Sequence, residues 1–261
     1  MNAIINLPLV PLRASDNEPS ELYSQLLFGE RVEIIEIRER WLFVRNLSDN
    51  YRGWVDQKMV HVLSSSDEDQ LAEKMKYVVQ VPLTLCCKNH SNEKMFLPGG
   101  SIIHTNKLGE FTMIDEIYHL SSSDLISKEE TNSQNLIPLA LQYLNAPYLW
   151  GGKSILGIDC SGLVQVVFAM SGIQLNRDAS EQVESGQAID SLSETKPGDL
   201  AFFENSNGKI IHVGILLNSH QIIHASGWVK VEAIDSTGIV SAQTGEYTHK
   251  LRAIKRIVSV I

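Results

Sequence analysis

The sequence is short of basic residues and has no long hydrophobic run. Its 22 Lys and Arg residues are outnumbered by 31 Asp and Glu residues, which gives a formal net charge of −9. Nucleic acids and anionic membranes bind basic protein faces, so we expect neither as a partner. The longest apolar stretches fall short of the roughly 18 residues needed to cross a bilayer, so no membrane-spanning helix is predicted.

Cysteine is also scarce, with three residues of which Cys86 and Cys87 are adjacent. This pattern does not form a disulfide framework. Residues 1–10 lack the basic start and the apolar core of a signal peptide. We therefore expect a cytoplasmic protein, although a chain that had lost its leader would show the same pattern. No cofactor is predicted, and a monomer is expected.

Residues 1–66 have the pattern of short β-strands. Segments 29–37, 40–45 and 51–55 are rich in β-branched and aromatic residues, and the turn-forming residues 48–50 separate two of them. Several short strands within about 60 residues predict a small β-barrel.

Residues 67–130 repeat this style less clearly. The strand candidates are residues 77–79, 83–85, 101–103 and 111–114. A Leu-Ser-Ser-Ser-Asp segment at 63–67 recurs at 120–124, 57 residues later, as a duplication would produce. We predict a second, degenerate barrel, with a serine-rich linker over residues 121–135.

The pattern changes in residues 131–261. Apolar residues recur at helical spacing from Leu136 to Leu144, and further helices are predicted over 160–170, ending near Gly172, and over 178–184. The strand candidates that follow are residues 200–204, 209–217, 221–226 and 250–257. Helices followed by strands predict an α+β domain.

The third cysteine, Cys160, follows an aromatic and glycine-rich turn at residues 147–152 and begins a predicted helix. A helix N-terminus favours the thiolate form. Two histidines lie in neighbouring predicted strands, and a hairpin centred on Asn218 would place His212 and His224 opposite each other, with Cβ atoms about 5 Å apart. A slip of one residue would put them on opposite faces. Such a group permits thiol catalysis, in which one imidazole takes the thiol proton and a second polar group orients the first ring.

A metal site made by Cys160, His212 and His224 is the alternative. No fourth ligand and no Cys-x-x-Cys spacing supports it, so no metal is predicted. Cys86 and Cys87 are expected to serve packing. The remaining histidines lie in loops or barrel segments and are expected to be solvated: His61, His90, His104, His119, His220 and His249.

Five segments in this order resemble the NlpC-type cell-wall peptidases, which are papain-like cysteine peptidases acting on peptidoglycan peptides. They are Tyr148–Gly152, Asp159–Leu163, Pro197–Leu200, His212–Ile215 and Ile223–Ala225. The Gly-Glu-x-Val, Trp-x-x-Val and Gly-Trp-Val run in the first barrel resembles the bacterial Src-homology-3-like domain. Together the barrels resemble the subgroup of γ-D-glutamyl-L-diamino acid endopeptidases that recycle muropeptides.

The resemblance implies a papain-like α+β catalytic domain in residues 131–261, preceded by two small Src-homology-3-like barrels. It also implies roles for individual residues. Cys160 would be the nucleophile, His212 the general base and His224 the orienting third member. The Tyr148 hydroxyl and the backbone N–H of Cys160 would stabilise the oxyanion.

The same resemblance implies a substrate-binding set. Asp159 would pair with the free α-amine of an N-terminal L-Ala. Trp150, Ser161 and Ser180 would line the site. Glu21 and Tyr51 are the candidates from the first barrel for holding the same amine.

The function expected from this resemblance is hydrolysis of the γ-D-Glu–diamino acid bond in peptidoglycan-derived peptides that carry a free N-terminal L-Ala. Two alternatives remain open. One is a cell-wall hydrolase, amidase or acyltransferase on the same fold. The other is a peptide-binding module whose catalytic domain is vestigial.

Overall fold

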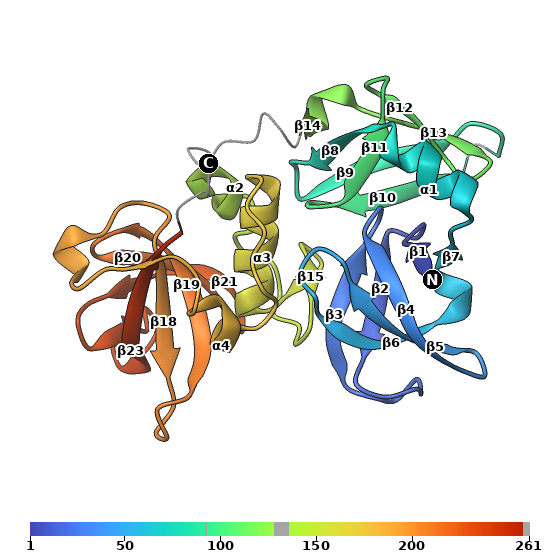
Figure 1. The fold of residues 1–261 in the computed structure, drawn as a ribbon. Helices are drawn as coiled ribbons and strands as arrows, with labels where there is room; N and C mark the ends of the chain where they lie inside the picture. The colour runs from blue at the N-terminus through green and yellow to red at the C-terminus, as the bar shows by residue number, and fades with distance from the viewer. Residues whose placement is uncertain (92, 128–135, 258–261) are drawn as a thin grey trace. The chain divides into compact units, whose positions relative to one another are not determined.

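The computed structural model describes residues 1–91, 93–127 and 136–257, which form mostly β-sheet with few helices (Figure 1). None of the helices in these ranges is long and apolar enough to cross a membrane. Residues 128–135 of the expected linker, and with them the expected domain boundary at 130, lie outside the described residues.

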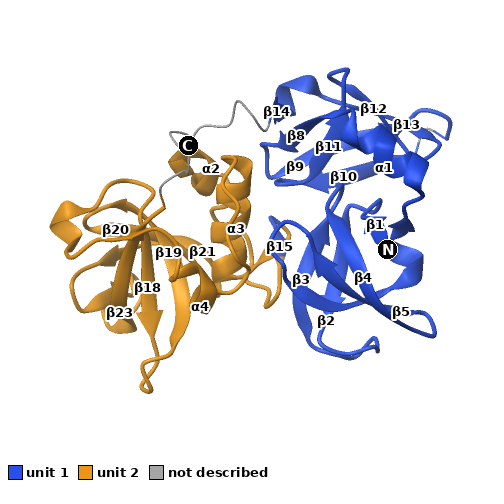
Figure 2. Cartoon of the chain, in the orientation of Figure 1, with its two compact units in different colours: residues 1–132, 153–155 blue, residues 133–152, 156–261 orange. Residues whose placement is uncertain are grey.

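The chain divides into two compact units (Figure 2). Unit 1 comprises residues 1–132 and 153–155, and unit 2 comprises residues 133–152 and 156–261. A short segment of the second half of the sequence thus belongs to unit 1, which a reading of the chain in order does not predict.

The first part of unit 1 is a seven-stranded antiparallel sheet in the order β3-β2-β6-β5-β4-β1-β7. Its elements are β1 (Asn2–Ile4), β2 (Leu9–Arg13), β3 (Leu22–Leu27), β4 (Arg31–Arg38), β5 (Trp41–Asn46), β6 (Arg52–Asp56), η1 (Gln57–Met59) and β7 (His61–Val62). The strands predicted over residues 29–37, 40–45 and 51–55 are confirmed as β4, β5 and β6. Alternate apolar side chains of these strands, such as Val32 and Val44, fill one core.

The second part of unit 1 contains a four-stranded sheet, β10-β9-β13-β12, and a three-stranded sheet, β11-β8-β14. Its elements are α1 (Ser65–Ala72), β8 (Met75–Val79), β9 (Leu83–Lys88), β10 (Lys94–Pro98), β11 (Ile102–Thr105), β12 (Glu110–Met113), β13 (Glu116–Leu120), η2 (Ser122–Asp124) and β14 (Leu125–Ser127). The four strand candidates of this region correspond to β8, β9, β11 and β12.

The two Leu-Ser-Ser-Ser-Asp segments fold differently. In the first, Ser64 and Asp67 form a reciprocal capping box that starts α1, a helix that the strand-like pattern of this region does not predict. In the second, residues 122–124 form a single turn that leads into β14. The described part of the expected linker, residues 121–127, therefore contains a turn and a strand.

A shared core joins the two parts of unit 1. Phe28 packs edge to face against Phe111 and Tyr118, with ring centroids 5.7 and 6.0 Å apart, and the backbone N–H of Ile102 donates to the carbonyl of Phe28 over 2.8 Å. The expectation that His104 is solvated is wrong, because its side chain is 3% exposed beside this core. Burial lowers the pKa of His104 to about 4, and neighbouring Lys and Arg side chains add to the effect.

All three cysteines are free thiols, and Cys86 is buried in the core of unit 1, as predicted from its setting.

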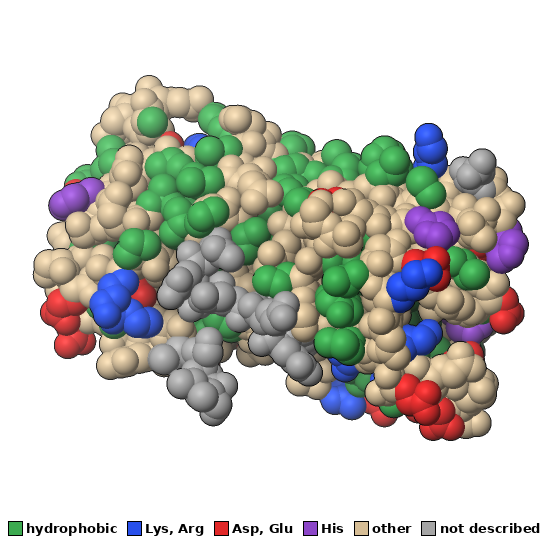
Figure 3. Space-filling view, turned by 90° about the horizontal axis from the view of Figure 1, so that it is seen from above, with side chains coloured by type: hydrophobic (Ala, Val, Ile, Leu, Met, Phe, Trp, Pro, Cys, Tyr) green, Lys and Arg blue, Asp and Glu red, His purple; other side chains and the backbone are tan. Residues whose placement is uncertain are grey.

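Charged side chains are mixed on the face drawn in Figure 3, where Lys and Arg lie near Asp and Glu. Surface ion pairs such as Lys88–Glu93 at 2.7 Å fit this mixed pattern.

Unit 2 carries helices on a seven-stranded antiparallel sheet in the order β17-β23-β18-β19-β20-β21-β22, and a β22–β23 pairing closes the strands into a ring. Its elements are α2 (Leu136–Leu141), β16 (Gly157–Ile158), α3 (Cys160–Met170), α4 (Ala179–Gln182), β17 (Gln187–Ala188), η4 (Leu192–Glu194), β18 (Leu200–Glu204), β19 (Ile210–Asn218), β20 (Gln221–Ser226), β21 (Trp228–Ile234), β22 (Gly238–Val240) and β23 (Tyr247–Arg256). Between α2 and β16, β15 (Lys153–Ser154) belongs to unit 1. Helix α3 packs against β19 and β20 (Figure 1).

Most elements of unit 2 agree with the sequence reading. The helix predicted over residues 160–170 is α3, and Gly172 follows its cap with φ of +82°, the left-handed conformation that ends many helices. The strands predicted from residue 200 onward correspond to β18, β19, β20 and β23. Strand β21 was missed, because Lys230 and Glu232 interrupt its apolar pattern.

Candidate active site

Cys160 is the first residue of α3, as predicted. Asp159 is the N-cap, with extended backbone angles, and its Oδ1 accepts the Gly162 N–H over 2.7 Å. A Cβ atom at Gly162 would lie 2.3 Å from the carbonyl oxygen of Gly152, so only glycine allows the preceding turn to pack on the first turn of the helix. The glycines of this stretch therefore hold the cysteine in place.

A buried ion pair fixes the same helix start. Arg177 is 1% exposed and makes a bidentate contact with Asp159, at 2.6 and 3.1 Å, while its Nη1 also donates to Ser161 Oγ over 2.8 Å. Asp159 Oδ2 accepts the Gly151 N–H as well. Both oxygens of Asp159 are thus engaged within the protein. The sequence reading gave no role to Arg177, since a single arginine in a loop carries no signal of its partner.

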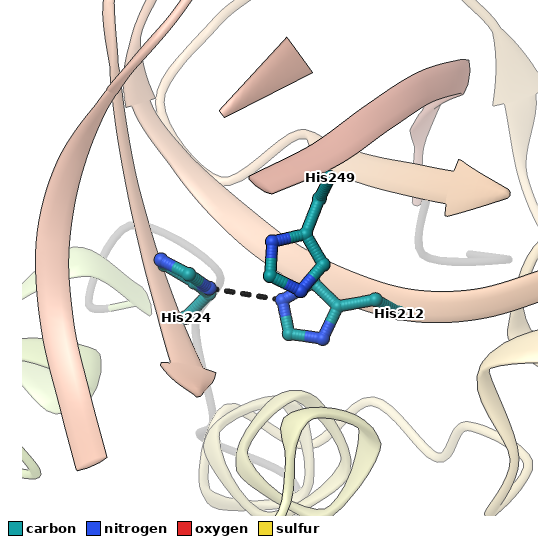
Figure 4. A group of neighbouring side chains, drawn as sticks. All are labelled: His212, His224 and His249. Carbon is teal, nitrogen blue, oxygen red and sulfur yellow. Dashed lines mark hydrogen bonds between the residues drawn. The ribbon is translucent and has the colours of Figure 1, made fainter. Parts of the chain in front are cut away.

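The histidine hairpin has a different register from the one expected. Ile215 pairs with Ile223, which brings Gly214, not His212, alongside His224. A tight turn after Asn218 and an irregularity before it shift the pairing by two residues. An even shift keeps side chains on the same face, so His212 and His224 still meet, along the diagonal of the ladder. His212 Nε2 lies 2.9 Å from His224 Nδ1 (Figure 4).

Gly214 provides the space for this contact. A Cβ atom at position 214 would lie 2.9 Å from the Cβ of His224 and 2.7 Å from Cδ1 of Ile222. These separations are shorter than carbon–carbon contact, about 3.5–4.0 Å. The glycine therefore lets the His224 ring approach β19.

A carboxylate completes the chain of polar contacts. Glu232, on β21, places Oε2 2.9 Å from His224 Nε2. Its Oε1 accepts the Ala242 N–H over 3.1 Å and lies 3.4 Å from Lys230 Nζ. Glu232 is 4% exposed and His224 is fully buried. The sequence reading missed Glu232, although an acidic residue inside an apolar strand was a signal that it has a partner.

His249 was expected to be solvated, and that expectation is wrong. It comes from β23 and is half-buried, and its ring stacks on His212 with centroids 4.1 Å apart and planes 27° apart (Figure 4). Ring nitrogens of His212, His224 and His249 lie within 4.8 Å of one another. A metal ion binds in the plane of each imidazole, however, and two nearly parallel stacked rings do not converge on one ion. The stacked geometry of these rings therefore does not favour a metal site.

Burial dominates the electrostatics of the thiol. It raises the pKa of Cys160 to about 12, and the negative charge of Asp159 adds to the effect, whereas the backbone N–H of Val213 and the Arg177 cation oppose it. The helix N-terminus is present as expected, but it is outweighed. Contact with the Val213 N–H also places the sulfur beside the residue that follows His212.

Tyr148 lies within electrostatic range of the same sulfur. Burial raises the pKa of Tyr148 to about 12, and the negative charge of Asp159, with the charge that Cys160 would carry if ionised, adds to this. Its hydroxyl therefore keeps its proton and can donate a hydrogen bond at neutral pH.

The two histidines are neutral at physiological pH. Burial lowers the pKa of His212 well below its ordinary value, and His249 and His224 contribute. Burial also lowers the pKa of His224 to about 4, although the contact with Glu232 opposes it. The thiol and both imidazoles are thus neutral at rest, a state from which a thiol proton can move to a histidine.

The remaining predicted residues are more exposed. Trp150 is 61% exposed within the turn at residues 147–152, and Ser180 is an exposed residue of α4, whereas Ser161 is buried and contacts Arg177. Glu21 and Tyr51 belong to unit 1, where Glu21 is exposed and Tyr51 packs edge to face on Tyr23. The roles of all these residues stay predictions.

Comparison with known proteins identifies two regions of the chain. Residues 145–250 match the NlpC/P60 family, and residues 12–59 match the bacterial dipeptidyl-peptidase Sh3 domain. Dipeptidyl-peptidase 6 of Lysinibacillus sphaericus is 30% identical over 87% of this chain and 88% of its own length. Gamma-D-glutamyl-L-lysine dipeptidyl-peptidase of Bacillus subtilis is 25% identical over 91% of this chain and 82% of its own length.

The fold agrees with this similarity. A crystal structure of an NlpC/P60 family protein from Bacillus cereus superposes with a TM-score of 0.83, covers 98% of this chain and 99% of that chain, and is 19% identical in sequence. One relative is similar over nearly the whole chain, and the N-terminal Src-homology-3-like region and the matched catalytic region agree with it. The chain therefore belongs to the NlpC/P60 family and is a cysteine peptidase, a hydrolase.

Proposed function

We propose that the protein hydrolyses the γ-D-Glu–diamino acid bond of peptidoglycan-derived peptides that carry a free N-terminal L-Ala. The observation that carries the proposal is the buried series of contacts from His212 to His224 to Glu232 beside the Cys160 helix start. Two similar proteins, from Bacillus subtilis and Bacillus cereus, are called gamma-D-glutamyl-L-lysine dipeptidyl-peptidase, and this supports the substrate class.

In the proposed mechanism Cys160 is the nucleophile. Its sulfur attacks the carbonyl carbon of the γ-D-glutamyl amide as His212 takes the thiol proton. The oxyanion accepts hydrogen bonds from the Tyr148 hydroxyl and the backbone N–H of Cys160. When the tetrahedral intermediate collapses, His212 returns the proton to the leaving amine and a thioester remains.

Water completes the reaction. His212 removes a proton from the water as it attacks the thioester, and then returns a proton to the departing sulfur of Cys160. The products are L-Ala-γ-D-Glu and a peptide that begins with the diamino acid. No group other than the peptide and water is consumed.

Recognition of the free amine is the second part of the proposal. An enzyme that removes a dipeptide must sense the amino terminus, which a carboxylate does by charge. Asp159 already accepts hydrogen bonds from Gly162, Gly151 and Arg177. In this proposal Asp159 orients the turn and its negative charge also attracts the amine. Glu21 and Tyr51 supply further contacts to the amine. The residues that line the site are Trp150, Ser161 and Ser180.

We further propose that residues 131–261 form a papain-like α+β catalytic domain, that residues 1–66 form the first barrel and that residues 67–130 form a second, degenerate Src-homology-3-like barrel. We also propose that the protein is a monomer and that it acts in the cytoplasm, where peptides from cell-wall turnover are recycled. Size measurement in solution and cell fractionation test the last two statements.

The decisive experiment is mass spectrometry of defined tripeptides. L-Ala-γ-D-Glu-L-Lys and L-Ala-γ-D-Glu-diaminopimelate are each incubated with wild type and with Cys160→Ala, and their N-acetylated forms are run in parallel. We expect release of L-Ala-γ-D-Glu from the free peptides by wild type alone. Turnover by Cys160→Ala would exclude Cys160 as the nucleophile. Cleavage of the acetylated peptides at the same rate as the free peptides would exclude amine recognition and favour a cell-wall hydrolase.

A further inference from the structure

The Glu232 carboxylate has a fixed direction of hydrogen bonding. Its Oε1 accepts the backbone N–H of Ala242 and lies against the Lys230 cation, so this oxygen carries no proton. The Ala242 N–H, the His224 contact and the Lys230 cation lower the pKa of Glu232, so the carboxylate is ionised and can only accept hydrogen bonds. The 2.9 Å contact between Oε2 and His224 Nε2 therefore requires that Nε2 carries the hydrogen.

That hydrogen decides the state of the next ring. A neutral imidazole has one N–H donor and one acceptor nitrogen. With its hydrogen on Nε2, His224 presents a lone pair at Nδ1. His212 Nε2, 2.9 Å away, must then donate, which leaves the lone pair of His212 on Nδ1.

We propose that Glu232 is a positioning residue that sets the tautomers of both His224 and His212 and so leaves Nδ1 of His212 free to take the thiol proton. The inference rests on the proposed function, in which His212 is the base for Cys160. His249 assists, because its ring covers one face of His212 at 4.1 Å and restricts the rotation that would exchange the two nitrogens.

Charge around the cluster fits this arrangement. Burial would raise the pKa of Glu232, but the Ala242 N–H, the His224 contact and Lys230 lower it overall, so the residue stays ionised. The groups that face the two imidazoles are Glu232, Lys230 and His249. When His212 becomes protonated during catalysis, Nε2 continues to donate to His224, and the Glu232 charge stabilises the cation through the chain.

Replacement of Glu232 by glutamine provides a distinctive test. The amide oxygen of Glu232→Gln must occupy the Oε1 position, since an NH₂ group there would face the Ala242 N–H and the Lys230 cation. The NH₂ group then points at His224 Nε2 and donates to it. Both hydrogen bonds in the chain reverse, and His212 carries its hydrogen on Nδ1, where it cannot accept the thiol proton.

Glu232→Ala removes the acceptor without imposing the reversed direction. We therefore expect the isosteric glutamine to be more harmful than alanine. The expected loss in kcat is about 10³–10⁴-fold for glutamine, the size caused by a wrong histidine tautomer in a Ser-His-Asp triad. It is about 10–10²-fold for alanine, as for loss of a carboxylate that orients a histidine. KM for the tripeptide should change little, because Glu232 contacts histidine and not substrate.

Nitrogen-15 NMR of the histidine rings reads the tautomers directly, and it does so without turnover. Wild type should show the hydrogen on Nε2 of both His212 and His224, and Glu232→Gln should show it on Nδ1 of both. Glu204→Gln is the matched control, because Glu204 lies on the same sheet and pairs with Lys250 and Arg252 rather than with histidine. This control should retain the wild-type tautomers.

The outcomes separate the two proposals. The role of Glu232 is overturned if wild-type His212 carries its hydrogen on Nδ1. It is also overturned if the glutamine variant keeps the wild-type tautomers, or if that variant is more active than the alanine variant. If the glutamine variant does not fold, the wild-type spectrum alone decides. Loss of the proposed function would instead appear as equal peptide turnover by wild type and Cys160→Ala, and it would leave the tautomer spectra unchanged.

Discussion

Gly214→Ala should move the two histidine rings apart, although every polar side chain of the site is retained. The new Cβ would lie 2.9 Å from the Cβ of His224 and 2.7 and 2.8 Å from two carbons of Ile222. Carbon atoms normally approach to about 3.5–4.0 Å, so the two strands must move apart locally by about 0.6–1 Å. Relief by side-chain rotation is restricted, because the Cβ of His224 is fixed to its backbone.

The displacement acts directly on the contact between the rings. His212 Nε2 and His224 Nδ1 are 2.9 Å apart, and a shift of this size takes them beyond hydrogen-bonding distance. Overpacking of a close-packed site costs about 1–3 kcal/mol of stability. A misplacement near 1 Å in a catalytic group costs about 10²-fold in rate. We therefore expect modest destabilisation and a much larger fall in kcat.

Two measurements test this prediction together: urea unfolding, and kcat for cleavage of L-Ala-γ-D-Glu-L-Lys. Gly245→Ala is the control, since Gly245 has φ of +72° and no atom within 4 Å of its Cβ position. Its strained backbone should cost about 1–2 kcal/mol, a similar loss of stability. Gly245→Ala should keep its activity. Full activity of Gly214→Ala, or equal activity loss in both variants, would refute the reasoning from the close approach at Gly214.

Three further predictions follow from burial and charge. Arg177→Ala leaves the Asp159 carboxylate buried without its bidentate partner and should lower the free energy of unfolding by about 3–5 kcal/mol, measured by urea titration. Acidification from pH 6.5 towards 4 should destabilise the fold. His104 and His224 have folded-state pKa values of about 4, below the unfolded value of 6.5, so they stay neutral while the unfolded chain takes up protons. By pH 4 each of the two histidines should lower the free energy of unfolding by about 3 kcal/mol, measured by urea titration at each pH. Iodoacetamide should alkylate Cys160 slowly at pH 7 and faster as the pH rises through 9, because burial raises its pKa to about 12.

Each of these predictions has a contrary result. Stability of Arg177→Ala within 1 kcal/mol of wild type, roughly the value of an exposed ion pair, would mean that the pair with Asp159 contributes little. Unfolding free energies that do not change between pH 6.5 and 4 would mean that His104 and His224 are not held neutral. A Cys160 alkylation rate that is already maximal near pH 6 would indicate a preformed thiolate, stabilised by the helix N-terminus against burial.

Local pattern was sufficient for much of the fold. Alternating apolar residues identified strands such as β4 and β18, and helical spacing identified α3 to the residue, because these signals depend on neighbours a few positions away. Where local signals were ambiguous the reading failed. Helix α1 was not predicted, although Ser64 and Asp67 form its capping box.

For the site, the sequence by itself determined the chemical groups and the start of the helix. It indicated a cysteine at a helix N-terminus and two histidines in neighbouring strands. The histidines share a face because the observed register differs from the expected one by two residues, an even number. Tertiary structure alone decided the hairpin register and the partners from distant strands. Arg177, Glu232 and His249 reach the site from a loop, from β21 and from β23, and no local pattern records such contacts. The thiol pKa was likewise decided by burial, which depends on everything that packs around Cys160, and burial outweighed the helix terminus that the sequence alone made visible.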